Sequence, residues 1–589
     1  MAPTTASSKM LSYAAAASVA LLSRCVSADP IADMYWPEID EFTAIMQSGR
    51  MLAVDSACLE PVESTGSAFD ARSPFWVFVV GATILVLGFI FYGRFVAGML
   101  NPDDSKTTPA LSLSDGVDFV AMSDAKVFLI QLLNIAGLGP IFGPILGGVY
   151  GPAAFGWIII GCIFCGSVMD YLVGMMSIIS QGASLPVLVG NELGNYAKHA
   201  LNVVTLILVI LVGVVFVKGP AALLANMTGG DMAVELWTAG IFAYYILATV
   251  VPINIIIGKI YPLFGLALIF MTVGLLGGTV ASGRPFPSLQ TTAPSGASWF
   301  PTIFIIISCS ALSGFHTTQS PMMARCIKKQ SSGFKIFFGA MITEGAIGLI
   351  WAMAPLVFYG GQAGLAKALT CAHNNPAAIV NTVLHTLLGP IGGAISIVGV
   401  VVLPITSGDT AFRCARLIVA EFFRAVEGQK DIKRRLLISV PMFAIAFGIS
   451  LVDFKMIWKY FNFTNQLLSA MALWAGAAFL RRTGKHVPVA FVPATFITLC
   501  LTTYICHSAE FGTKAVPLWI SATIGAVVTA CITVAMSVVL KRLPVETEAD
   551  IKHKEEKNLE EGEPKQAMTE RMENNNSVTD SNTAVEQQV

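Results

Sequence analysis

The chain has 589 residues, of which 55% are hydrophobic and only 12% are charged. Soluble domains carry about 25% charged residues, so this composition cannot cover a water-facing surface of ordinary size. Residues 541–589 alone hold 19 of the 73 charged side chains. Composition therefore excludes a soluble globular protein and a disordered scaffold, and a net charge of −1 gives no reason to expect a nucleic-acid partner. A polytopic all-α membrane protein remains.

The two ends of the chain differ from the middle. Residues 1–28 have the pattern of a targeting peptide, because Lys9 precedes an apolar run at 11–22 and small residues at 26–28 resemble a cleavage site. A transit peptide is the alternative. Residues 29–73 are typical of an extracytoplasmic segment, and residues 541–589 are expected to form a disordered cytoplasmic tail.

About 13 apolar stretches approach the ~20 residues that a transmembrane helix needs. The first covers 75–100 and belongs to an additional helix at 74–100. The others, numbered 1 to 12 in chain order, are 127–150, 153–179, 200–218, 236–251, 261–281, 301–323, 337–359, 389–411, 436–452, 457–480, 487–506 and 516–540.

Lys and Arg concentrate in the segments that follow spans 6, 8 and 10. Positive charge marks the cytoplasmic side, so we expect these segments and the C-terminus in the cytoplasm and the protein in the plasma membrane. The residues concerned are Arg325, Lys328, Lys329 and Lys335, then Arg413, Arg416, Arg424, Lys430, Lys433, Arg434 and Arg435, then Arg481, Arg482 and Lys485.

Spans 1 and 6 carry residues that interrupt a helix. Pro removes a backbone donor and Gly favours unwinding, and in lipid the freed backbone groups survive only in protein or beside a cavity. Close packing of small residues is the alternative for either span alone. The residues that we expect to contact a solute are Asn134, Gly137, Gly139 and Pro140 in span 1, and Ser313, Gly314, His316 and Thr317 in span 6.

The two interrupted spans lie five apart, and each opens a five-span block, at 126–281 and 301–480. An odd number of spans per block forces opposite topology, which predicts a 5+5 inverted-repeat transporter core followed by two further helices at 487–540. Half-helix N-termini at the interruptions would offer free N–H groups to a carboxylate.

Ionisable and hydroxyl side chains inside other spans suggest ion coupling. Asp170 in span 2 and Glu344 in span 7 are candidates to carry a proton, because buried carboxylates in membranes are usually functional. A structural hydrogen bond is the alternative for each. Span 8 has four oxygen-bearing side chains that face span 1 in a 5+5 fold and are candidate sodium ligands, although Asp409 is alternatively solvated beside Arg413. These four are Thr406, Ser407, Asp409 and Thr410.

Motifs for other chemistry are missing. The sequence has no phosphate loop, GxSxG or HExxH, so we expect neither an enzyme nor a cofactor. Cys162 and Cys165 are expected to pack rather than to bind metal. One disulfide among Cys58, Cys371 and Cys506 is possible, and its pairing cannot be read from sequence.

Five linked motifs carry a resemblance to a known family. They are DGVDFV at 115–120, NIAGLGPIFGPILGG at 134–148, GSVMDYLVGM at 166–175, QGASLPVLVG at 181–190 and SGFHTTQSPM at 313–322. In order and spacing they resemble the carbon starvation protein A family, over most of the membrane region. Where the long bacterial forms are expected to carry a His pair, this chain has Ile130 and Gln131.

The resemblance implies a secondary carrier of the amino acid–polyamine–organocation type. Its members are linked to uptake of peptides, and some to uptake of pyruvate with protons, during nutrient starvation. The motif matches transfer eight residues, which are Asp118, Gly137, Gly139, Pro140, Asp170, Ser313, Gly314 and His316. We therefore expect a transporter for a peptide or a small carboxylate, coupled to H⁺ or Na⁺ in a lipid bilayer. A nutrient sensor or channel that keeps the fold is the alternative.

Overall fold

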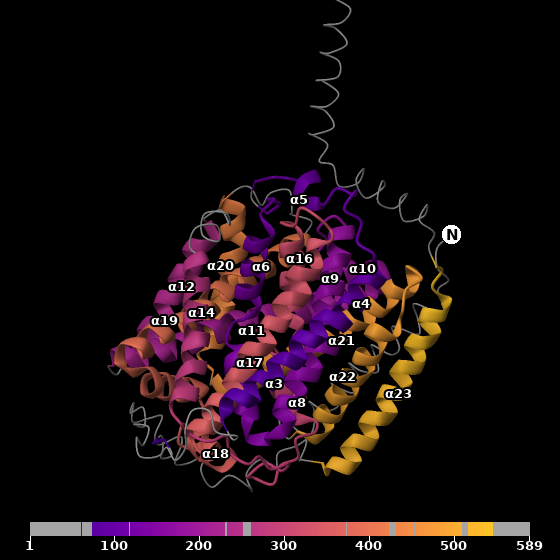
Figure 1. Ribbon diagram of the computed structural model, residues 1–589. Coiled ribbons are helices and arrows are strands. Elements are labelled where there is room, and N and C mark those ends of the chain that lie inside the picture. Colours follow the sequence, from indigo (N-terminus) through magenta and orange to yellow (C-terminus); the bar gives the residue numbers. More distant parts are fainter. Residues whose placement is uncertain are drawn as a thin grey trace, which may run out of the picture.

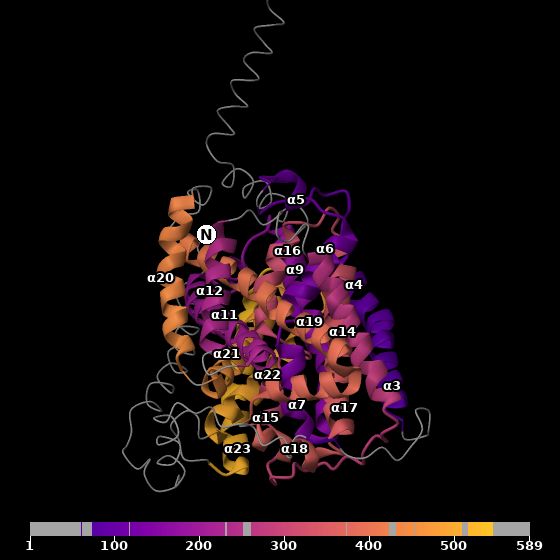
Figure 2. The same cartoon turned by 90° about the vertical axis from the view of Figure 1, so that its left-hand side faces the viewer.

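The computed structural model describes residues 60–61, 73–116, 118–229, 233–250, 261–372, 374–422, 432–452, 454–508 and 516–545. These ranges contain helices and their connections and no β-strand. Figures 1 and 2 show a bundle of helices that mostly run along one common direction. The predictions for residues 1–28, for most of 29–73 and for the tail from 546 onward lie outside the described residues.

The first half of the described chain contains eleven α-helices joined by short turns. Two π-helical turns, η3 (Gly88–Gly93) and η5 (Cys162–Gly166), make continuous rods of the helices on either side of them. The α-helices are α3 (Pro74–Leu87), α4 (Arg94–Leu100), α5 (Pro109–Ser112), α6 (Asp124–Ile135), α7 (Gly139–Gly147), α8 (Pro152–Gly161), α9 (Ser167–Ile179), α10 (Leu185–Leu193), α11 (Asn195–Thr228), α12 (Ala233–Val250) and α14 (Tyr261–Ala281).

The second half contains the remaining helices. A third π-helical turn, η6 (Phe334–Phe338), leads directly into α17. The α-helices are α15 (Thr302–Ile306), α16 (Gly314–Ala324), α17 (Gly339–Phe358), α18 (Gln362–Cys371), α19 (Pro376–Phe422), α20 (Ile432–Ser450), α21 (Phe454–Arg482), α22 (Pro488–His507) and α23 (Leu518–Arg542).

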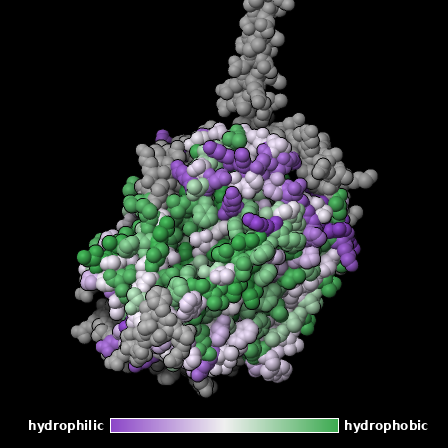
Figure 3. Space-filling view, viewed as in Figure 1, coloured by the Kyte–Doolittle hydropathy of each residue, from purple (hydrophilic) through white to green (hydrophobic). Residues whose placement is uncertain are grey.

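Nine helices of the described part are long and apolar enough to cross a membrane, or ten if the bent pair α6 and α7 counts as one span. Shorter apolar helices cover Ala233–Ala248 and Arg435–Ser450. Figure 3 shows hydrophobic residues over the flank of the bundle and hydrophilic residues gathered at its upper end. The chain is an all-α polytopic membrane protein, and the total of about 13 spans stays a prediction.

Burial separates the helices into a centre and a periphery. In α9 every residue from Ser167 to Ile178 is buried, whereas η3 and α4 expose large apolar residues such as Phe91 (71% exposed). Apolar side chains on an exposed flank are stable in lipid, where they need no partner helix. Buried ionisable side chains in a membrane protein are usually functional, so a functional site is expected in the centre, among α6, α9, α16, α17 and α19.

One expectation about the loops is wrong. Arg413 and Arg416 were placed after span 8, but α19 continues to Phe422 and both side chains are buried within it. The same helix begins before the expected span and is kinked at Gly389, whose φ of 71° is non-helical. A window of about 20 apolar residues cannot detect a helix that extends beyond the bilayer.

Candidate functional site

Both predicted interruptions are present. Helix α6 ends at Ile135, Ala136 has a non-helical ψ of 52°, and α7 begins at Gly139 with a bend of 46° between the two helices. The second break is longer, because α15 ends at Ile306 and α16 begins only at Gly314. Backbone groups that leave a helix in the membrane must find other partners.

The two breaks lie against each other. A Cβ on Gly139 would overlap the Cys309 side chain of the second break, and a Cβ on Gly143 would lie 3.0 Å from the Ile306 carbonyl oxygen. Only glycine allows this approach. The structure therefore brings together the two segments that sequence placed in separate halves of the chain.

Side-chain amides from α21 support the second break. Asn465 Oδ1 accepts hydrogen bonds from the Phe315 N–H (2.7 Å) and from Ser313 Oγ (3.2 Å). Gln466 Nε2 donates to the carbonyls of Phe304 (2.8 Å) and Leu312 (3.1 Å). These amides supply the hydrogen bonds that the unwound backbone cannot make to itself.

Sequence analysis missed these amides. Asn462, whose Oδ1 accepts from Ser308 Oγ at 2.9 Å, lies three and four residues before Asn465 and Gln466, so all three share one helix face. Buried amides at i, i+3 and i+4 in an apolar span are the signal that would have identified them.

The N-terminus of α16 is less available than predicted. The Phe315 N–H donates to Asn465, and the His316 N–H donates to the Ser313 carbonyl at 3.2 Å. Two of the N–H groups expected to receive a carboxylate are therefore engaged. By contrast, both side-chain amide atoms of Asn134, at the end of α6, are buried and have no hydrogen-bond partner.

Three ionisable side chains from three helices meet beside the second break. His316 Nδ1 lies 3.2 Å from Asp170 Oδ2, and His316 Nε2 lies 3.4 Å from Glu344 Oε2. All three side chains have 0% solvent exposure. Sequence named each residue separately, on α16, α9 and α17, and the structure unites them. We call Asp170, His316 and Glu344 the carboxylate–imidazole cluster.

The cluster has more acidic than basic groups. Among the described residues no Lys or Arg forms an ion pair with Asp170 or Glu344. Asp170 Oδ1, both carboxylate oxygens of Glu344 and His316 Nε2 have no hydrogen-bond partner. With both carboxylates ionised and the imidazole protonated, the cluster carries one excess negative charge. A net charge buried this deeply is costly, and one further proton removes it.

The hydroxyl face of α19 meets the end of α6. Ser407 Oγ donates to the Leu133 carbonyl at 3.0 Å and also lies 3.0 Å from the Leu403 carbonyl of its own helix. Thr406 and Thr410 bond to carbonyls of α19 itself. The predicted meeting of span 8 with the interruption of span 1 therefore exists, with Ser407 as the contact.

Asp409 does not join this contact through a hydrogen bond. Its Oδ2 lies 3.1 Å from Arg413 Nε, four residues on, and both side chains are buried rather than solvated. Arg413 also donates to the Ala248 carbonyl at 2.7 Å. A carboxylate paired in this way is already balanced, and its geometry is that of a structural ion pair.

Other predicted features have plain structural roles. The Asp115 carboxylate accepts from the N–H groups of Asp118 and Phe119, both at 2.9 Å, and so closes the turn that precedes α6. Cys162 and Cys165 are buried free thiols in η5. Cys371 is disulfide-bonded. No group of metal-ligating side chains occurs in the part of the chain that the structure describes.

The family profile described as "Carbon starvation protein CstA" matches residues 73–234, 231–388 and 360–504. An "Uncharacterized membrane protein" of Haemophilus influenzae is 44% identical over 349 residues, covering 50% of this chain and 94% of that protein. A protein named "Peptide transporter CstA" in Escherichia coli is 24% identical, covering 73% of this chain and 80% of its own length. Its namesake in Mycobacterium tuberculosis is 29% identical, covering 55% and 52%.

Solved structures similar to this chain include a manganese transporter of Eremococcus coleocola. A mutant of that transporter has a TM-score of 0.44 at 15% identity, covering 75% of this chain and 99% of the other. The same transporter bound to an aromatic bis-isothiourea substituted compound has a TM-score of 0.37 at 13% identity, with the same coverage.

Proposed function

The chain belongs to the carbon starvation protein CstA family, and from that premise we propose that it is a proton-coupled secondary transporter. Relatives that bear the name peptide transporter support a peptide as the transported solute. A small carboxylate such as pyruvate is the alternative solute in this proposal. Uptake serves nutrient starvation, and the site of action is the plasma membrane.

The carboxylate–imidazole cluster is the single observation that carries the proposal. A coupling site must change protonation when it faces the two sides of the membrane in turn. His316 contacts both Asp170 and Glu344, and all three side chains are fully buried, with two carboxyl groups beside one imidazole. If both carboxyl groups are ionised and the imidazole is protonated, the cluster carries one excess negative charge. Binding one proton neutralises the cluster, and losing it restores the charge. The free-energy difference between these states provides the coupling.

Cargo and proton are linked because His316 belongs to both features. It lies two residues after Gly314, the first residue of α16, so it occupies the first turn that follows the second break. Solute that enters between the breaks then contacts the helix that holds the imidazole. The unpartnered amide of Asn134, at the other break, supplies both a donor and an acceptor for a polar solute.

Purified protein in liposomes tests the proposal. An inward proton gradient should drive accumulation of labelled dipeptide or pyruvate, and Asp170→Asn and Glu344→Gln should abolish this accumulation. Glu235→Gln is the matched control, because Glu235 is an exposed carboxylate on α12. Uptake by the wild type that ignores an imposed proton gradient would contradict proton coupling.

Sodium is the second candidate ion, and one contact favours it. Ser407 Oγ and the Leu133 carbonyl are hard oxygen ligands at the end of a broken helix, an arrangement that holds Na⁺ in other transporters. If sodium couples transport, Ser407→Ala should abolish sodium-driven uptake and leave proton-driven uptake unchanged. A sensor or channel would show no gradient-driven accumulation with either ion.

A further inference from the structure

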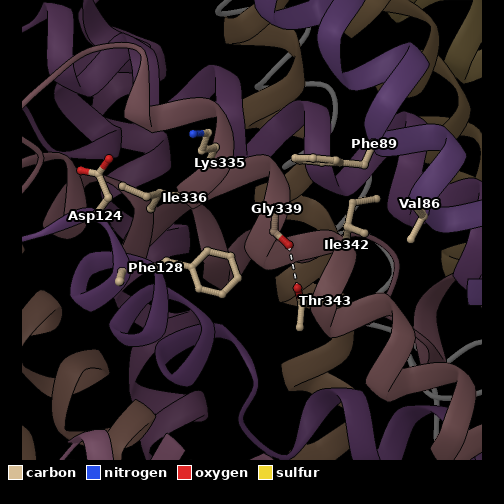
Figure 4. A pocket seen from close by; sticks show the side chains of 10 residues that line it. Val86, Phe89, Asp124, Phe128, Lys335, Ile336, Gly339, Ile342 and Thr343 are labelled. Atoms are coloured by element: carbon tan, nitrogen blue, oxygen red, sulfur yellow. Dashed lines mark hydrogen bonds between the residues drawn. The ribbon is translucent and has the colours of Figure 1, made fainter.

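A groove on the flank of the bundle lies apart from the carboxylate–imidazole cluster. It has a volume of about 400 Å³ and is bordered by the rod of α3 and η3, by α6, and by η6 with α17. Figure 4 shows Phe89, Phe128 and Ile342 around it. Its outer wall belongs to the rod that exposes apolar side chains to the membrane, with Val86 50% exposed. The groove therefore opens towards lipid.

The wall of the groove is apolar. Phe89 stacks on Phe334 with ring centroids 4.7 Å apart, and the Thr343 hydroxyl donates to the Gly339 carbonyl of its own helix at 2.9 Å (Figure 4). Apart from Asp124 and Lys335 at one end of the groove, the wall therefore offers no unsatisfied polar group that would hold water in place. A hydrocarbon chain suits such a surface.

Two opposite charges border the same groove where α6 and η6 begin (Figure 4). Asp124 accepts one hydrogen bond, from Ser332 Oγ at 2.7 Å, and so keeps acceptor capacity on its other oxygen. Lys335 is exposed and lies more than 4.0 Å from that carboxylate, since the two form no ion pair. Lys328 and Lys329, at the same end of the bundle, are exposed too.

From this charge pattern we propose that the groove binds phosphatidylethanolamine. The phosphate of this lipid would pair with Lys335, its primary ammonium would donate to Asp124, and an acyl chain would lie along Phe89 and Ile342. Phosphatidylcholine has no N–H to donate, and phosphatidylglycerol has no cation for the carboxylate. Charge complementarity therefore selects the zwitterion with a hydrogen-bonding amine. The proposal does not depend on what the protein transports.

The groove also touches the helix of the central cluster. Thr343, on the groove wall, is the residue before Glu344, so an acyl chain in the groove packs against the segment of α17 that carries the buried carboxylate. A lipid bound in the groove would therefore contact the helix that carries Glu344 directly.

Native mass spectrometry of delipidated full-length protein tests the proposal. Palmitoyl-oleoyl phosphatidylethanolamine, phosphatidylcholine and phosphatidylglycerol are titrated in turn. We expect the ethanolamine lipid to bind about tenfold more tightly than the other two, the factor that one charge-assisted hydrogen bond supplies. Asp124→Asn should abolish this preference and Lys335→Gln should weaken the binding of all three lipids, whereas Lys328→Gln, on the adjacent connecting segment, should change neither.

Three results overturn the proposal. Equal binding of the three lipids means general annular lipid, and preference for phosphatidylglycerol means an anionic-lipid site. A preference that survives Asp124→Asn means that the lipid binds elsewhere. The first two results are measured on the wild type alone, so they test the proposal even if a variant does not fold.

Discussion

The two broken helices differ in how the polar groups at their breaks are hydrogen-bonded. The break between α6 and α7 is short, is made by Gly and Pro, and leaves the Asn134 amide without a partner. The break between α15 and α16 is longer, and the amides of α21 satisfy its backbone. The second break is therefore a braced structural element, and the first retains unused polar capacity. We therefore expect the solute to make more of its polar contacts at the first break, between α6 and α7, than at the second.

The largest effect is expected at the point where the second break touches α21. A side chain at Gly314 would overlap the Asn465 carbonyl oxygen, which belongs to the backbone and cannot yield cheaply. Gly314→Val should therefore remove most folded protein, because overpacking against backbone costs about 3 kcal/mol or more. Size-exclusion chromatography of a fluorescent fusion measures the yield. Gly277→Val, with open space around the glycine, is the control.

A smaller but clear loss is expected for the brace itself. Asn465→Ala leaves the buried Phe315 N–H and Ser313 hydroxyl without their partner. An unsatisfied buried donor costs about 1–3 kcal/mol, so the thermal midpoint should fall measurably. Asn465→Asp keeps the acceptor oxygen and should recover part of the loss. If Asn465→Ala unfolds at the wild-type temperature, the second break is not braced as described.

Asn134 should behave in the opposite way. Asn134→Leu removes two unpartnered polar atoms and replaces them with a side chain of similar size, so stability should change by less than about 1 kcal/mol or rise. Solute uptake should nevertheless fall at least tenfold if this amide contacts cargo. Paired thermal and uptake measurements check this. Normal uptake would place the solute away from the first break.

The smallest effect is expected outside the bundle centre. Hydrogen bonds from Ser331 Oγ (2.6 Å) and N–H (2.9 Å) hold the pKa of Asp104 below its ordinary value of 3.8. The ionised form is the one stabilised, so the contribution is complete above pH 3.8 and disappears as pH falls through the lowered pKa.

Solvent screening limits this contribution to about 0.5 kcal/mol. The thermal midpoint of Asp104→Asn should therefore lie slightly below the wild type at pH 7, and the two should converge once the pH falls below the lowered pKa of Asp104. A constant difference between the two proteins across this range would exclude titration of Asp104 as its cause.

Sequence anticipated the breaks because Gly and Pro act locally. Gly139 and Pro140 weaken helix propagation locally, and the structure places them where α7 begins, directly after the first break, so a one-dimensional pattern is enough to point to it. The assembly of Asp170, His316 and Glu344 is different, because nothing local to any of the three spans reports the other two. Each residue was a candidate alone, and only helix packing makes them one cluster.

Two further features depended on three-dimensional context. The role of the α21 amides is to form hydrogen bonds with a break that lies about 150 residues earlier in the chain, and the sequence near α21 does not indicate these partners. Asp409 was expected to bind sodium or to be solvated, and instead it is buried against Arg413. That pairing depends on α19 continuing past the apolar window, which hydropathy cannot show.

The central claim is that the carboxylate–imidazole cluster carries the coupling proton, and Glu344→Gln tests it most directly. In liposomes, exchange of labelled for unlabelled solute needs solute binding and conformational change but no net proton movement. Accumulation of solute against its gradient needs net proton movement as well. We predict that Glu344→Gln keeps exchange within about threefold of the wild type and loses proton-driven accumulation. Undiminished proton-driven accumulation by Glu344→Gln would contradict the assignment.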